Sequence, residues 1–184
     1  MNIKPSIFFI IFISTIFYGC KNEISNSKFE YNRKANELIQ QLISEEKCDC
    51  IVEIPKETLI ELETLEVPNF NSEKYYVEKL SLKSKKEFDS LKKITQDFTL
   101  DQIFLKNNKI RIIRRDSLQI MIKNNFNSKI CKTGITFFIK PIFNKKFDVA
   151  IISYGEVGIH GGIGRKLFEY KDNKWVIKTA GNRL

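Results

Sequence analysis

The sequence predicts a single α+β domain in which two amphipathic helices pack on a mainly antiparallel sheet. In the first half of the chain, apolar residues recur at the three- and four-residue spacing of helices. In the second half, apolar and polar residues alternate, as in strands that bury one face. Helices followed by a run of adjacent strands are typical of α+β proteins. The sequence shows no internal repeat and no linker that would divide this domain.

The first predicted helix spans Ser27 to Glu46. Ser27 and Glu30 have the spacing of a capping box, which satisfies free backbone N–H groups at a helix N-terminus. An apolar stripe follows at helical spacing and consists of Ala35, Leu38, Ile39, Leu42 and Ile43. The next segment, CDCIVEIP, predicts a strand that Pro55 closes.

Residues 56–82 fit neither period well, because their partial alternation is interrupted by Pro68 and by an NFN turn. Ser84 and Glu87 then form a second capping box. The apolar residues behind it have helical spacing and are Phe88, Leu91, Ile94 and Phe98. They predict the second amphipathic helix.

The remaining segments are typical of strands. KIRIIRR and SLQIMIK alternate, although Asp116-Ser117 equally fits the start of a short helix. Four further strands are expected at 134–139, 147–153, 166–170 and 174–178. Asp172-Asn173, between the last two, favours a tight hairpin turn. We expect Trp175 to pack in the core.

The first twenty residues, MNIKPSIFFIIFISTIFYGC, have the layout of an export signal. Lys4 gives a positively charged n-region, and an uncharged, mainly apolar run of eleven residues extends from Ile7 to Phe17. This run is shorter than the about 20 residues of a spanning helix and fits the roughly 7–15 apolar residues of a secretory signal. Gly19-Cys20 at its end resembles the bacterial lipoprotein signal. That resemblance implies cleavage before Cys20, a diacylglycerol on its sulfur, and a fatty acid such as palmitate on its amine.

These features predict three parts: a signal peptide at 1–19, a lipidated cysteine with a polar tether at 20–27, and a folded domain at 28–184. By analogy with lipoprotein sorting in Gram-negative bacteria, Lys21 in place of aspartate favours the outer membrane. The expected location is therefore the cell envelope, with an outer-membrane lipid anchor and a domain facing the periplasm or the cell surface. An uncleaved anchor and an ordinary signal peptide stay open as alternatives.

The chain is basic, with 31 lysines and arginines against 22 acidic residues and a formal net charge of +9. Removing residues 1–19 removes one lysine and no acid, so the charge falls to +8. The basic residues are scattered, and export from the cytoplasm argues against nucleic acid as a partner. We expect a solvated surface with an attraction of about 1 kcal/mol per lysine or arginine to nearby anionic lipid.

Three cysteines remain beside Cys20, and one disulfide with one free thiol is the simplest arrangement in an oxidising compartment. If Cys48 and Cys50 lie on one strand, their Cα atoms are nearly 7 Å apart by a rise of about 3.3 Å per residue, at the limit for a bridge. We therefore expect Cys131 to pair with one of them. A zinc site is the alternative, but it needs a fourth ligand such as His160, and Cys-x-Cys is not a usual zinc spacing.

The segment YGEVGIHGGIGRKLFEY, residues 154–170, holds five of the eight glycines and the only histidine. It fits neither a Walker loop, since Lys166 stands where a hydroxyl residue belongs, nor a dinucleotide loop, whose third glycine is Leu167 here. Both motifs also need a following helix, whereas this sequence continues as a hairpin. We interpret residues 154–165 as a broad connection between strands, and we expect neither a cofactor nor a metal.

His160 is the one candidate for acid–base catalysis near neutral pH. A hydrolase would also need a nucleophile and an orienting acid, for which Ser153, Cys131 and Glu156 are the available residues. None of them lies in a recognisable motif. The same segment is also the best candidate for contact with a partner, through His160, Arg165, Lys166 and Glu156.

The stretch from about Lys93 to Ile177 resembles uncharacterised small lipoproteins and secreted proteins of Bacteroidota. The pieces that carry this resemblance are FFIKPIFNKKFDVAIISYGEVGIHGGIG and LFEYKDNKWVI. Relatives often carry cysteines in the glycine loop, where this chain has Gly158-Ile159-His160-Gly161, so a loop disulfide is not expected. The resemblance implies no particular activity.

The sequence thus predicts a lipoprotein whose domain binds a protein or a small ligand without catalysing a reaction. The alternative is a cell-envelope hydrolase that uses His160. The one partner with a stated chemistry is the membrane, reached through the acyl chains on Cys20.

Overall fold

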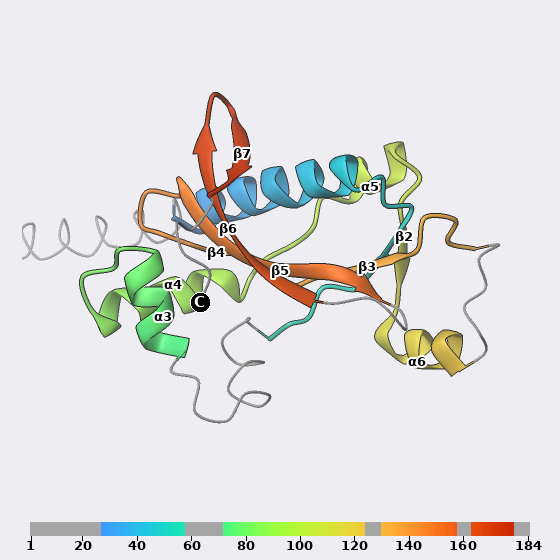
Figure 1. Ribbon diagram of the computed structural model, residues 1–184, viewed down its shortest axis with the longest axis horizontal. Coiled ribbons are helices and arrows are strands. Elements are labelled where there is room, and N and C mark those ends of the chain that lie inside the picture. The colour runs from blue at the N-terminus through green and yellow to red at the C-terminus, as the bar shows by residue number, and fades with distance from the viewer. Residues whose placement is uncertain (1–26, 58–71, 124–129, 158–162, 179–184) are drawn as a thin grey trace, which may run out of the picture.

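The computed structural model describes residues 27–57, 72–123, 130–157 and 163–178 (Figure 1). These form one α+β unit around an open sheet, as the sequence predicts. The described strands are β1 (Cys50–Val52), β2 (Arg111–Ile113), β3 (Ile135–Phe138), β4 (Ile142–Phe143), β5 (Val149–Val157), β6 (Ile163–Lys171) and β7 (Lys174–Ile177). Their order across the sheet is β2-β1-β3-β5-β6-β7, with β4 paired to β5 outside this path.

The sheet is mainly antiparallel. β1 runs parallel to both β2 and β3, whereas β3, β4, β6 and β7 join through antiparallel pairs that centre on β5 and β6. β3 and β4 pair with successive parts of β5, because Phe138 faces Tyr154 and Ile142 faces Ile151. The break between these two strands includes Pro141, which has no N–H to donate to a ladder.

One face of the sheet is covered by a long helix whose described part spans 27–45 (Figure 1). Its apolar stripe is buried as predicted, and it packs against Phe138, Ala150, Ile152 and Phe168. The helix ends where Lys47 adopts a left-handed backbone with φ 53°. The N–H of Cys48 then donates to the carbonyl of Ile43 at 3.0 Å, which closes the last turn and directs the chain into β1.

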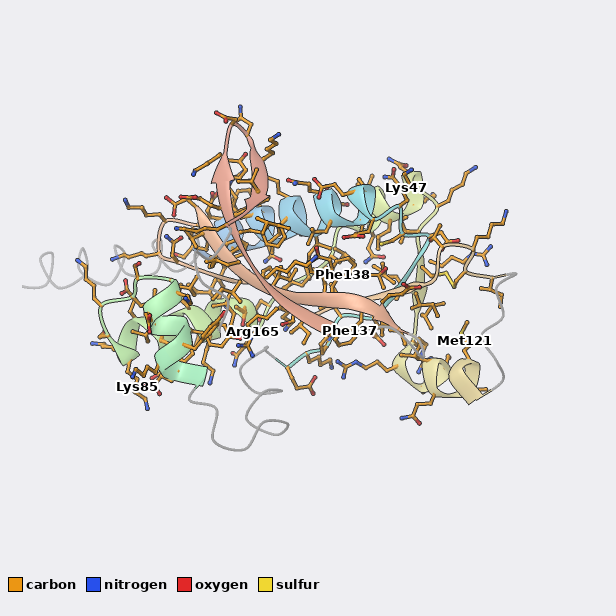
Figure 2. The ribbon with its side chains drawn as sticks, viewed as in Figure 1. Lys47, Lys85, Met121, Phe137, Phe138 and Arg165 are labelled. Atoms are coloured by element: carbon orange, nitrogen blue, oxygen red, sulfur yellow. A yellow bond between two sulfur atoms is a disulfide. The ribbon has the colours of Figure 1, made fainter. Side chains whose placement is uncertain are left out.

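The opposite face carries helices at its two ends, with α3 (Ser72–Lys79) and α4 (Lys85–Thr95) at one end and α6 (Arg115–Lys123) at the other (Figure 1). α5 (Gln102–Asn107) instead lies on the side of the long helix, where Leu105 joins the same buried cluster. Tyr76 and Phe88 of the α3–α4 pair pack against Ile142 and Ile151. Figure 2 shows Phe138 on the side of the long helix and Phe137 on the other side, as the alternation of a strand requires.

The second predicted helix is α4, and its capping box is present. Ser84 is the N-cap, and its side chain accepts a hydrogen bond from the N–H of Glu87 at 3.3 Å. The Glu87 carboxylate in turn accepts from the N–H of Lys83 at 2.7 Å. Segment 72–79, for which the sequence favoured no period, is helix α3, whereas residues 58–71 lie outside the described part of the chain.

The structure decides between two alternatives at one segment and corrects the prediction at another. SLQIMIK is helical as part of α6, the alternative that Asp116-Ser117 left open, because Leu118 and Met121 at helical spacing pack on the cluster around Cys50 and Cys131. The broad connection expected at 154–165 is narrower, because β5 continues to Val157 and β6 begins at Ile163. Backbone pairing between Gly155 and Ile163 continues the ladder through these residues.

The final hairpin forms as predicted. Asp172 and Asn173 both have positive φ angles, 50° and 61°, which suits the two-residue turn between β6 and β7. Trp175 is buried and contacts the rings of Phe143 and Tyr170. Trp175 also belongs to the buried cluster that contains the apolar stripe of the long helix, so the hairpin packs against that helix.

Candidate ligand-binding site

A polar hollow of about 240 Å³ lies where the long helix ends and the sheet continues beyond it. Its lining residues are Glu46, Thr133, Thr136, Tyr154, Gly155, Glu156, Gly164 and Lys166. Strand pairing builds the floor, since Thr136 faces Glu156 across β3 and β5, and Tyr154 faces Gly164 across β5 and β6. This volume is small beside the roughly 300–1,000 Å³ of typical ligand pockets, so the hollow suits a small molecule or one side chain.

Lys166 places a positive charge in the polar hollow. Its Nζ donates to the hydroxyl oxygen of Tyr154 at 2.6 Å and lies 4.3 Å from the centre of the same ring. Tyr154 is itself fixed, because it is buried and stacks on Phe138 at 5.7 Å between ring centroids. The remaining N–H groups of the ammonium suit a carboxylate or another oxygen acceptor.

Glu156 places a negative charge in the same hollow. A Cβ added at Gly134 would lie 2.5 Å from its Oε1, and Gly134 has a φ of +92° that L-residues rarely adopt. The carboxylate therefore occupies space that only glycine leaves open. With Glu46 also in the lining, the hollow combines two carboxylates with one ammonium and the hydroxyls of Thr133 and Thr136.

The wall at 130–134 is fixed to the start of β1 by a clamp around Asp49. The Asp49 carboxylate accepts from the N–H of Lys132 at 2.6 Å and from the Thr133 hydroxyl at 2.6 Å. Burial raises the pKa of Asp49, but these hydrogen bonds outweigh it and hold that pKa below its usual value. One residue further along, Cys50 is joined to Cys131 by a disulfide, with Cα atoms 5.6 Å apart.

Cys48 lies beneath the floor as a buried free thiol. Its Sγ is 3.0 Å from the hydroxyl oxygen of Thr136, whose side chain lines the hollow. Burial raises the pKa of this thiol above its ordinary value, against the opposing effect of the Thr136 contact. At neutral pH the sulfur is therefore protonated and a poor nucleophile.

The structure brings together two of the four residues expected to contact a partner. Glu156 and Lys166 share the polar hollow. Arg165 points to the other face of the sheet, where its guanidinium lies 4.8 Å from the ring centre of Tyr75 and 5.9 Å from that of Tyr76. Figure 2 shows Arg165 beside the α3–α4 pair. His160 lies outside the described residues.

The groups that a hydrolase would need are not assembled in the described part of the chain. Cys131 is in the disulfide and has no thiol to attack a substrate. Ser153 is buried on the strand face opposite to Tyr154 and Glu156. The zinc alternative loses two ligands because Cys50 and Cys131 are joined, and no group of three metal-binding side chains occurs among the described residues.

Sequence reasoning did not find Glu46, Thr133 or Thr136 as site residues. They come from the end of the long helix, the turn before β3 and β3 itself, so no local spacing links them. The one usable signal was the change from apolar to polar residues on the same strand face, from Phe138 to Thr136 and from Tyr154 to Glu156.

The described residues form an α+β domain with a small hollow lined by charged side chains. The chain matches no protein-family model, no curated protein sequence and no solved structure at a significant level of similarity. Within the described residues, none of the helices is both long and apolar enough to cross a membrane.

Proposed function

We propose that this protein is a lipoprotein of the bacterial cell envelope, anchored in the outer membrane through an acylated Cys20. The observation that carries this proposal is the position of Cys20, immediately after the uncharged apolar run and before a polar segment. Each buried methylene contributes about 0.8 kcal/mol, so two or three acyl chains give a stable attachment where one chain alone is marginal.

The folded part begins soon after this cysteine, because Ser27 is already helical. Ser27 is the seventh residue after Cys20, and seven steps of at most about 3.6 Å each span roughly 25 Å. A domain on so short a tether stays close to the bilayer. This arrangement supports a role in binding at the envelope, on its periplasmic or outer side.

We infer that the domain binds a small polar ligand, or one charged side chain of a protein, in the polar hollow. The support is the pairing of opposite charges there: Lys166 suits an oxygen anion, and Glu156 with Glu46 suits an amine or hydroxyl donor. A ligand that carries both an amine and a carboxylate satisfies both sides. Binding alone needs no nucleophile, which distinguishes this role from the hydrolase alternative.

Membrane fractionation of a Cys20→Ser variant tests the anchor. We expect the wild-type chain in the membrane fraction, and the variant to be unlipidated and uncleaved by a lipoprotein-type peptidase. Cys48→Ser is the matched control, because its buried thiol is not a predicted lipid attachment site. A Cys20→Ser chain that is processed and anchored like the wild type contradicts the proposal.

Thermal unfolding with a panel of free amino acids tests the hollow. A ligand present at 100 times its Kd stabilises the native state by about 2.7 kcal/mol, so its binding raises the Tm. We expect Lys166→Gln to abolish this rise and Lys85→Gln, which removes an exposed lysine elsewhere, to preserve it. A rise that survives Lys166→Gln contradicts binding in the hollow, and a rise abolished by His160→Ala favours a site that includes the glycine loop.

A further inference from the structure

A second hollow, of about 410 Å³, lies at the other end of the long helix and includes Ser27, the first described residue. Three lysines line it, Lys83, Lys86 and Lys145, against one acid, Glu87. We call this surface the basic hollow. It lies within seven residues of the proposed lipid attachment at Cys20.

Two of the lysines are held by the first turn of α4. The N–H of Lys83 donates to the Glu87 carboxylate, and the N–H of Glu87 donates to the Ser84 hydroxyl. These bonds fix the backbone around Lys83 and Lys86. They also occupy the carboxylate of Glu87, which accepts one of them. Both lysine side chains are exposed.

Lys145 is held by the turn between β4 and β5. The Asn144 side chain accepts from the N–H groups of Asp148 and Val149 at 3.1 and 3.2 Å and donates to the Asp148 carboxylate at 2.6 Å. The turn is also tied to the long helix, since the Tyr31 ring packs edge-on against Phe143. These contacts fix the backbone that carries Lys145, which lines the same hollow as Ser27.

The charges of the basic hollow are available to a partner. In the described part of the chain, nearby ion pairs join Lys85 to Glu73 and Lys28 to Asp97. No ion pair there includes Lys83, Lys86 or Lys145. A surface with three exposed lysines and one engaged acid suits an anionic partner.

We propose that the basic hollow docks on the anionic headgroups of the bilayer that holds the lipid anchor, an inference that rests on the proposed function. The tether of at most roughly 25 Å keeps this surface near the headgroups, whose attraction for lysine acts within a Debye length of about 8 Å. Docking then sets the orientation of the domain. The polar hollow, at the far end of a helix about 28 Å long, then faces away from the membrane.

Amine footprinting of the full-length lipoprotein tests this docking. The protein is reconstituted into neutral phosphatidylcholine vesicles or into vesicles with added phosphatidylglycerol, acylated briefly with an amine reagent, and digested for mass spectrometry. We expect at least threefold slower modification of Lys83, Lys86 and Lys145 on the anionic vesicles than on the neutral ones. In 1 M KCl, the rates on the anionic vesicles should return to those on the neutral vesicles. Lys47 and Lys132 are exposed and serve as internal controls. Figure 2 shows Lys47 at the far end of the long helix, and Lys132 lies beside Thr133 of the polar hollow.

Single substitutions separate docking from general surface attraction. Lys86→Gln should reduce the protection of Lys83 and Lys145, whereas Lys85→Gln, one residue away and paired with Glu73, should leave it unchanged. Equal rates on both kinds of vesicle, or equal protection of Lys47, overturns the proposal. The mass of the peptide that contains Cys20, measured in the same digest, shows whether the lipid anchor is present. A failure of the anchor proposal is thus distinguished from a failure of the docking proposal.

Discussion

The side-chain amide of Gln41 pairs with the backbone of Trp175 on both sides. The N–H of Trp175 donates to Gln41 Oε1 at 2.8 Å, and Gln41 Nε2 donates to the Trp175 carbonyl at 2.6 Å. Trp175 lies on β7, the edge strand of the described sheet, whose backbone groups have no strand partner on that side. A helix side chain thus replaces a neighbouring strand and fixes the hairpin to the long helix.

We predict that Gln41→Leu destabilises the domain by roughly 1–3 kcal/mol, because two backbone groups of Trp175 lose their partner in a partly buried place. Urea unfolding measures the change. Gln40→Leu is the matched control, since Gln40 has one longer contact, 3.2 Å to Asp101. An equal loss of unfolding free energy for the two substitutions would show that the hydrogen bonds from Gln41 to Trp175 do not stabilise the domain.

The hydroxyl of Tyr31 makes a second long-range contact from the long helix. It is buried and donates to the carbonyl of Pro141 at 3.0 Å, at the break between β3 and β4. Burial raises the pKa of this hydroxyl, which therefore stays protonated as a donor. We expect Tyr31→Phe to cost about 1–3 kcal/mol in urea unfolding, because the carbonyl is left unpaired while the ring contacts remain. An unchanged unfolding midpoint would contradict this reading.

Thiol counting tests the arrangement of the cysteines. The unfolded, unreduced protein with a lipidated Cys20 should show one free thiol, that of Cys48, and three thiols after reduction. In the folded protein Cys48 should react at least tenfold more slowly, because burial hides the sulfur and raises its pKa. Three thiols without reduction would exclude the disulfide.

We also predict that Cys50→Ser lowers the free energy of unfolding by about 2–5 kcal/mol, as removal of native disulfides does.

The clamp around Asp49 gives a pH dependence with a defined sign. The folded state holds the pKa of Asp49 below that of an unfolded aspartate, about 3.9. The unfolded chain therefore binds the proton first, and the stabilisation is full above about pH 5 and is lost as the pH falls through the folded pKa.

We predict that Asp49→Asn flattens the loss of stability between pH 5 and pH 3, because the variant has no carboxylate to protonate there. Urea midpoints at both pH values measure the slope. Asp172→Asn, in the exposed hairpin turn, removes the same charge without removing the clamp. A slope for Asp49→Asn equal to that of the wild type would show that the clamp does not respond to pH.

Much of the fold could be predicted because single elements carry their own signals. The stripe from Ala35 to Ile43 marks one face of a helix, and Asp172-Asn173 marks a turn that needs positive φ. α6 could not be separated from a strand, because its apolar residues fit both periods. Only the packing of Leu118 and Met121 on the cluster around Cys50 and Cys131 decides for the helix. α5 was missed, although the Asp101 side chain accepts from the N–H groups of Ile103 and Phe104 as an N-cap.

The polar hollow could not be predicted as a unit. Its charged residues come together because β1 pairs in parallel with β3, and because Gly134 leaves room for the Glu156 carboxylate. Neither the parallel pairing of β1 with β3 nor the free space beside Gly134 can be inferred from one sequence. Arg165 and Lys166 point to opposite faces of β6, as neighbours in a strand do, but the sequence placed Arg165 in the connection before that strand.

The lipid anchor proposed at Cys20 can be tested through the mass of the N-terminal peptide. Protein extracted from membranes is digested, and the peptide that contains Cys20 is measured. We expect a peptide that begins at Cys20 and carries two or three fatty acyl chains. A peptide that begins before Cys20, or one whose Cys20 carries no lipid, would contradict it.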